Sequence, residues 1–123
     1  MSNQPLDKEL DPTPLVNAIT EKTKAGKLKW EATANPNTFI ASVGGTTTLK
    51  IDLELGYTSD PYGNPEQAEL PRLCFLDEKG NTRWEISNRD VKGNLWPLFR
   101  LAQRIGNKLD ERMEILMEVV QKL

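Results

Sequence analysis

The spacing of apolar residues changes once along this chain, and that change constrains the fold more than any other feature. Apolar and polar residues alternate through TTTLKIDLEL, residues 46–55. A two-residue period is typical of a strand in an antiparallel sheet with one buried and one hydrated face. From Leu95 to the C-terminus, apolar residues instead recur every three or four positions, which predicts a long helix. The strand residues expected to point inward are Leu49, Ile51, Leu53 and Leu55.

The remaining elements are predicted from the same two periods and from turn residues. Thr13 suits the N-cap of a first helix at residues 14–25. Residues 56–69 contain two prolines and two glycines, which predicts an irregular loop. Trp84 falls on an inward strand position and is expected in the same core cluster as the leucines above. Further strands are predicted at residues 27–33, 38–43, 70–76 and 82–87.

The expected fold class is α+β: an N-terminal helix, about five antiparallel strands in a meander, and a long C-terminal helix packed on one sheet face. The chain has 123 residues, so residues 1–123 are expected to form a single domain, with residues 1–11 as a flexible N-terminal segment. No run approaches the roughly 20 apolar residues that cross a bilayer. The N-terminus lacks a signal-peptide pattern, and one cysteine forms no internal disulfide. These features predict a cytoplasmic protein that does not enter a membrane.

Two local motifs support this order of elements. The segment KTKAGKLKW follows the first predicted helix, and a D-x-x-G-N turn at residues 77–81 joins the last two strands. Together with the terminal helix, this pattern resembles small uncharacterised bacterial and phage proteins with a kT-x-x-G-k-l-x-W signature. The resemblance implies the helix–sheet–helix fold and brings no known activity, cofactor or functional residue.

The composition argues against catalysis. The chain has no histidine, which removes the usual general base at neutral pH and the commonest transition-metal ligand. Asp52 and Glu54 share the hydrated face of one strand and are the one candidate carboxylate pair for a metal or acid–base site. Cys74 alternates with apolar neighbours and is expected to be a buried, unreactive thiol. We therefore expect no enzyme activity, no cofactor and no metal.

Two charged or aromatic groups remain as candidate contacts, and a further basic cluster has a structural explanation. Lysines cluster around the end of the first helix, where cations complement the helix dipole. A basic band on the last helix suits phosphate groups, although acidic residues lie among its members and can pair with them. Two loop tyrosines suit a ligand or a partner. The net charge of −2 argues against nucleic-acid binding. The lysines are Lys22, Lys24, Lys27 and Lys29; the band is Arg100, Arg104, Lys108 and Arg112; the tyrosines are Tyr57 and Tyr62.

The last helix is too apolar beyond Gly106 for one buried stripe, which predicts a homodimer. The alternative is a helix that bends at Gly106 and wraps its own sheet. Three functions are compatible with these features. The first is a non-enzymatic binding or assembly protein that contacts an unknown protein partner. The second is a protein of phage-inhibitor type that binds a small ligand, an anionic nucleotide. The last is a hydrolase that uses carboxylates and a divalent metal ion. The expected dimer interface is Leu109, Ile115, Leu116, Val119 and Val120.

Overall fold

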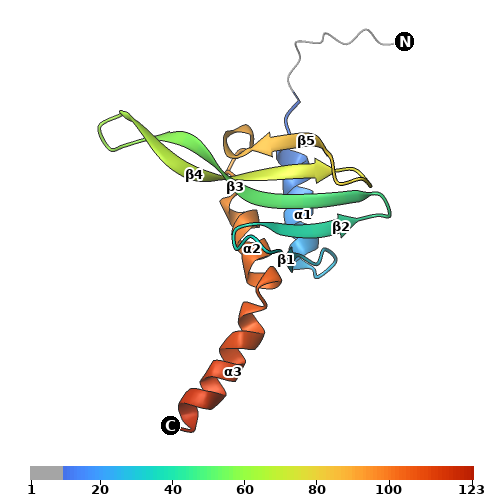
Figure 1. Ribbon diagram of the computed structural model, residues 1–123. Helices are drawn as coiled ribbons and strands as arrows, with labels where there is room; N and C mark the ends of the chain where they lie inside the picture. The colour runs from blue at the N-terminus through green and yellow to red at the C-terminus, as the bar shows by residue number, and fades with distance from the viewer. Residues whose placement is uncertain (1–9) are drawn as a thin grey trace.

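The computed structural model describes residues 10–123, so the expectation for residues 1–11 falls outside the described residues except at Leu10 and Asp11. The five strands form one antiparallel sheet in chain order, β1-β2-β3-β4-β5. This arrangement confirms the α+β class with a meander sheet (Figure 1). The elements are α1 (Thr13–Lys24), β1 (Glu31–Ala32), β2 (Phe39–Val43), β3 (Thr47–Ser59), β4 (Pro65–Leu76), β5 (Thr82–Ser87), the short 3-10 helix η1 (Asn88–Asp90), α2 (Trp96–Gly106) and α3 (Leu109–Gln121).

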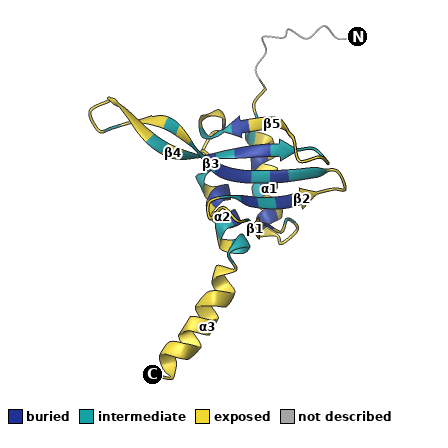
Figure 2. Cartoon of the chain, in the orientation of Figure 1, coloured by how far each residue is buried: buried dark blue, intermediate teal, exposed yellow. Residues whose placement is uncertain are grey.

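Helices α1 and α2 lie on one face of the sheet, and the hydrophobic core fills the space between these two helices and the sheet (Figures 1 and 2). Leu49 and Ile51 of β3 are buried there as predicted, and Phe39 of β2 packs edge-on against Phe99 of α2 with ring centroids 6.0 Å apart. Alternation along the strands places these side chains on the covered face. The buried core residues are Val16, Ile19, Trp30, Phe39, Ala41, Leu49, Ile51, Leu73, Ile86, Val91, Leu95, Leu98, Phe99 and Ala102.

The KTKAGKLKW segment closes α1 rather than forming the predicted strand at residues 27–33, of which only Glu31 and Ala32 pair with β2. Gly26 adopts a φ of +74°, and the Lys27 amide donates back to the Lys22 carbonyl at 2.9 Å. The Thr23 hydroxyl donates to the Ile19 carbonyl and accepts a hydrogen bond from Trp30 Nε1 at 3.1 Å. The residues of the signature are therefore structural, because they end the helix and anchor a buried tryptophan.

The start of α1 also differs slightly from the prediction. Pro12, rather than Thr13, is the N-cap. The Thr13 hydroxyl instead accepts a hydrogen bond from the Lys92 amide at 3.1 Å, which ties the loop before α2 to the start of α1.

Two predicted core positions are wrong. Leu55 is 69% exposed, because β3 continues beyond the part of the sheet that the helices cover. Trp84 is 42% exposed; it lies on the edge strand β5 and stacks on Phe75, with ring centroids 4.8 Å apart. Leu53 is half-buried and packs against the rim of the core.

The prediction of an irregular loop at residues 56–69 is also wrong, because β3 and β4 stay paired as a two-stranded ribbon as far as Ser59 and Pro65. We call residues 55–70 the arm; it projects from the sheet at the upper left of Figure 1. Its tip, residues 60–64, repeats the D-x-x-G-N turn of residues 77–81, and in both turns the Asp carboxylate accepts two backbone amides. The residue directly before each Asn is a glycine with positive φ, +81° at Gly63 and +83° at Gly80.

The C-terminal helix is broken in two. Helix α2 ends at Gly106, and Lys108 adopts a left-handed conformation with φ 52° before α3 begins. Helix α3 then points away from the sheet (Figure 1) and is exposed along its whole length (Figure 2). The sequence left open whether this helix runs on or bends at Gly106, and the structure has a break there. The expected packing of the whole helix on one sheet face is wrong, and so is the alternative in which its second half wraps its own sheet.

Candidate interaction surfaces

The open face of the sheet carries an ion-pair network centred on Arg72. Arg72 lies directly opposite Asp52 in the β3–β4 register and donates two hydrogen bonds to its carboxylate, at 3.0 and 2.9 Å. Glu54 lies 3.2 Å from the same guanidinium, and Lys50 lies 3.8 Å from Asp52. These carboxylates raise the pKa of Arg72 still further above its usual range. Asp52 and Glu54, the candidate acid–base pair, are therefore both paired with the permanently charged guanidinium of Arg72.

Cys74 lies on this open face too, between Lys50 and Glu85 in the register, and is 1% exposed. Burial is the main cause that raises the pKa of the Cys74 thiol, and repulsion by the Asp52 carboxylate raises this pKa further. A thiolate is disfavoured in this position. The expectation of a buried thiol is confirmed, although its neighbours are the charged residues of the open face rather than the apolar core.

The four residues of the basic band do not form one continuous row, because the helix breaks at Lys108, the third residue of the band. The Arg100 guanidinium stacks 5.6 Å from the centre of the Trp96 ring. Arg104 donates two hydrogen bonds to Asp110, at 3.0 and 3.2 Å, and so links the end of α2 to the start of α3. Lys108 forms the left-handed corner, and Arg112 is exposed on α3.

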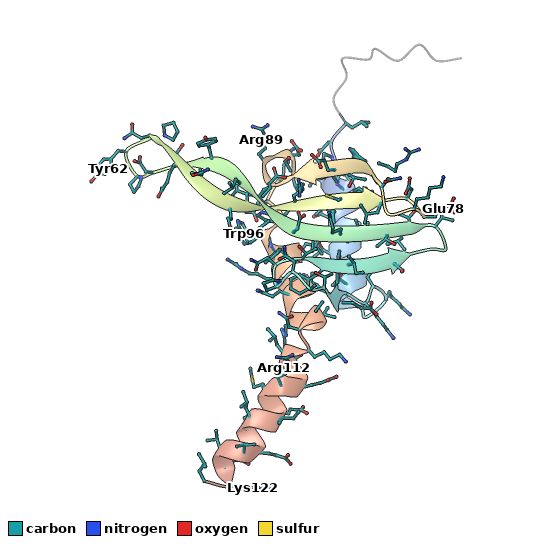
Figure 3. All side chains as sticks on the ribbon, viewed as in Figure 1. Tyr62, Glu78, Arg89, Trp96, Arg112 and Lys122 are labelled. Carbon is teal, nitrogen blue, oxygen red and sulfur yellow. The ribbon has the colours of Figure 1, made fainter. Side chains whose placement is uncertain are left out.

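The two candidate tyrosines lie on the arm. Tyr57 is on β3 and Tyr62 is at the tip, and both are exposed. In Figure 3, Tyr62 lies at the tip of the arm and Arg112 lies on α3, which projects in a different direction, so the structure does not bring the tyrosine tip and the end of the basic band into one pocket. The arm is acidic, with Asp60, Glu66 and Glu69 and no lysine or arginine.

A cavity of about 480 Å³ lies where the arm joins the sheet. Its wall includes Tyr57, Leu70, Asn88 and Arg89. A cavity of this size is within the usual range for small-molecule sites, which is about 300–1,000 Å³. Sequence analysis missed Arg89, because only the strand pairing of the arm brings residues 54–58 beside η1.

Helix α3 carries seven of the exposed large apolar side chains among the described residues. Its apolar side chains are between 41% and 62% exposed. At about 100° per residue they cover an arc of about 200°, interrupted only by Arg112. We call this arc the α3 surface. It contains all five residues of the expected dimer interface. Its members are Leu109, Met113, Ile115, Leu116, Met117, Val119 and Val120.

A second apolar surface lies between α1 and the β2–β3 turn. This groove has a volume of about 470 Å³, and its walls include the side chains of Leu15, Leu28 and Val43. Lys22 and Lys27 also line it. Leu15, on α1, is 40% exposed. Sequence analysis did not predict this groove, because it explained the lysines at the end of α1 by the helix dipole.

Comparison with protein families, curated proteins and solved structures found no match for this chain. Among residues 10–123, no three cysteine or acidic side chains are grouped closely enough to hold a metal ion. No helix in the described part of the chain is both long and apolar enough to cross a membrane.

Proposed function

We propose that this chain is a non-enzymatic assembly protein that acts through protein–protein contacts, with the α3 surface as the interface of a homodimer. One observation carries the proposal: the apolar side chains of α3 are exposed, and within residues 10–123 the main element that α3 contacts is α2. Apolar patches of this kind on soluble proteins are usually contact sites.

The energetics favour a covered helix. An isolated helix shorter than about 12–15 residues is marginal in water, and α3 has 13. Fully burying a leucine, isoleucine, valine or methionine side chain contributes roughly 1.5–3 kcal/mol. Burial of several such side chains against a partner would stabilise both the helix and the complex. A second copy is the simplest partner, because most soluble homo-oligomers have two-fold symmetry.

The centre of the α3 surface has the spacing of a helix-pairing seam. Leu109, Met113, Leu116 and Val120 follow steps of four, three and four. This is the a/d pattern of a coiled coil, with leucines at d and a β-branched valine at one a position, which suits two-stranded pairing. The seam spans less than two heptads, so it is shorter than the three to four heptads typical of a self-sufficient coiled coil.

Light scattering over a range of concentrations tests the proposal. The chain mass is 13.9 kDa, and we expect twice that mass at micromolar concentration. Leu116→Glu should give the monomer mass, because it places a charge in the centre of the seam. Leu55→Glu is the matched control, since Leu55 is similarly exposed, at 69% against 62% for Leu116, but lies on the arm. A chain mass of 13.9 kDa that persists at high micromolar concentration would contradict the proposal.

The non-enzymatic part of the proposal is supported by the missing histidine and by the pairing of Asp52 and Glu54 with Arg72. Turnover in a phosphatase or nuclease screen that is lost on Asp52→Asn would contradict it. We place the protein in the cytoplasm, since its single cysteine is free and forms no disulfide.

A second candidate function is the binding of a small anionic ligand such as a nucleotide. The cavity at the base of the arm supports it, because Arg89 supplies a cation and Tyr57 an aromatic ring. Glu54 also lines this cavity and opposes an anion. A nucleotide present at a hundredfold excess over its dissociation constant should stabilise the fold by about 2.7 kcal/mol. A thermal-shift panel without a response would contradict this candidate.

A further inference from the structure

The outer edge of β3 has no backbone partner along the arm. Pairing between β2 and β3 ends at Ile51, which lies opposite Phe39. Beyond that point β3 pairs only with β4, and among residues 10–123 no backbone hydrogen bond joins residues 54–59 to any other segment. The N–H and C=O groups of a strand face its two edges in turn, so this edge has donors and acceptors without a protein partner.

This edge also lacks the features that usually protect an exposed strand, which are lysine, proline and bulges. Residues 53–59 contain no lysine and no proline, and their register with β4 has no shift. The outer edge of β4 differs, because Pro65 and Pro71 have no N–H and η1 contacts this strand. The β3 edge is therefore the side of the arm that suits an added strand.

The cavity at the base of the arm follows this edge. Its lining includes the consecutive β3 residues 54–58, together with Arg89 of η1. Successive side chains of a strand point to opposite faces, so a cavity over one face would be lined by alternate residues. Lining by consecutive residues indicates that the cavity runs along the backbone. Figure 3 shows Arg89 beside the base of the arm. The volume of about 480 Å³ accommodates a few side chains of an extended segment.

The charge of the arm selects the kind of segment that fits. Asp60, Glu66 and Glu69 lie within residues 55–70, which contain no lysine or arginine. None of the three has a cation within 4.0 Å in the described part of the chain. The arm of a second copy would bring like charges together, which is unfavourable across paired strands. A basic segment would meet opposite charges instead.

The charges at the base of the arm offset one another. Glu54 lies 3.2 Å from the Arg72 guanidinium, and Arg89 is followed by Asp90 in η1. The field along the β3 edge therefore comes mainly from the three carboxylates of the arm and is negative.

We infer that the β3 edge of the arm binds an extended segment of a partner protein in which lysine or arginine alternates with apolar residues. The segment adds a strand beside residues 54–58, so that backbone hydrogen bonds hold it and alternate side chains enter the cavity. Leu55 and Tyr57, 69% and 74% exposed, supply apolar contact. This inference rests on the proposed function as a protein-binding chain and specifies a contact separate from the α3 surface. The arm projects away from α3 and leaves both contacts free to form (Figure 1).

A model peptide that alternates lysine and valine tests this contact. Its dissociation constant from the full-length chain is measured by fluorescence anisotropy, beside a peptide in which glutamate replaces every lysine. The lysine peptide should bind, and the glutamate peptide should bind about tenfold more weakly or worse, because its charges repel the arm. Glu66→Lys/Glu69→Lys should reverse this preference. Both glutamates are exposed, so the variant should keep the fold.

Two further lysine peptides test the added strand on the unaltered chain. Each carries N-methyl groups on every second backbone amide, one on the odd positions and the other on the even positions. Because alternate N–H groups of a strand face opposite edges, one methylated peptide should lose binding and the other should stay within about threefold of the original. Equal effects of the two methylated sets would overturn the added strand.

Two protein variants serve as controls. Glu31→Lys/Glu78→Lys makes the same charge change at exposed positions on β1 and in the turn between β4 and β5. Leu116→Glu alters the α3 surface. Both should keep the dissociation constant of the lysine peptide within about twofold, because neither touches the arm. A loss of binding in either control as large as that in the arm variant would place the contact elsewhere.

The outcomes separate this inference from the homodimer and from the small-ligand candidate. A chain that stays monomeric but binds the lysine peptide would overturn the homodimer and keep the arm contact. A dimer that does not bind the lysine peptide would do the reverse. A thermal-shift response to a nucleotide without binding of the lysine peptide would assign the cavity to a small ligand and overturn the arm contact.

Discussion

Single residues on β3 show how position along a strand decides burial. Ile51 and Leu55 have the same parity, so alternation alone assigns them to the same face. Ile51 is fully buried under the helices, whereas Leu55 lies at the start of the arm, where no helix covers the sheet. Between them, Asp52 is buried on the opposite face, because the register sets Arg72 beside it.

Truncating Ile51 should therefore cost far more than truncating Leu55. Ile51→Ala leaves a cavity at a fully buried site and should lower the free energy of unfolding by about 2–5 kcal/mol. Leu55→Ala changes an exposed site and should stay within about 0.5 kcal/mol of the original. Urea unfolding at one fixed protein concentration measures both. A loss below about 0.5 kcal/mol for Ile51→Ala would mean that the strand register is wrong.

At the scale of elements, the end of α2 is determined by a close approach to the sheet. Gly106 has no positive φ, so its backbone conformation does not require glycine. A Cβ placed there would lie 2.6 Å from Phe39 Cδ1 and 3.2 Å from the Ala32 backbone nitrogen. Phe39 is completely buried, so its ring has little room to move.

Gly106→Ala should therefore destabilise the protein, against the usual helix preference. Alanine normally favours a helix interior over glycine by about 1 kcal/mol. Overpacking against Phe39 should reverse the sign and lower the free energy of unfolding by about 1–3 kcal/mol. Gly45→Ala is the control, because that glycine has no positive φ and open space around its Cβ. Stabilisation by Gly106→Ala would show that α2 does not lie this close to the sheet.

At the scale of the whole molecule, two elements project from a body made of the sheet, α1 and α2 (Figures 1 and 3). The arm is a two-stranded ribbon whose backbone is paired along its length. Helix α3 is held to the body by the Arg104–Asp110 pair and the short connection after Gly106. Surface ion pairs contribute little, typically below about 1 kcal/mol, so this pair alone does little to stabilise α3.

Hydrogen exchange should distinguish these two projections. If α3 lies in a dimer interface, protection of the amides of Leu109–Gln121 should rise as protein concentration increases, since dimerisation is a mass-action effect. Amides at the arm tip, residues 60–64, serve as the internal control and should exchange at a rate independent of concentration. Exchange in α3 that is fast at every concentration would contradict the proposed interface.

Local patterns in the sequence determined the class and order of the elements. These patterns are the two-residue period, the turn residues and the three-to-four-residue period. Each depends only on residues that are close in sequence, so it can be recognised without knowledge of the tertiary structure. They specified α1, β2, the buried half of β3 and β5, whereas they left a bend at Gly106 as one of two alternatives. The D-x-x-G-N repeat at residues 60–64 also carried the signal for the arm, although the prolines around it favoured a loop.

Only the tertiary structure decided the features that depend on residues distant in sequence. The β3–β4 register buries Asp52 against Arg72, and the exposure of Leu55 depends on where α1 and α2 end over the sheet. Helix α3 has an apolar pattern that would suit packing on its own sheet, yet the left-handed corner at Lys108 directs it away. Periodicity identifies an apolar face but not what covers it, because covering depends on the path of the whole chain.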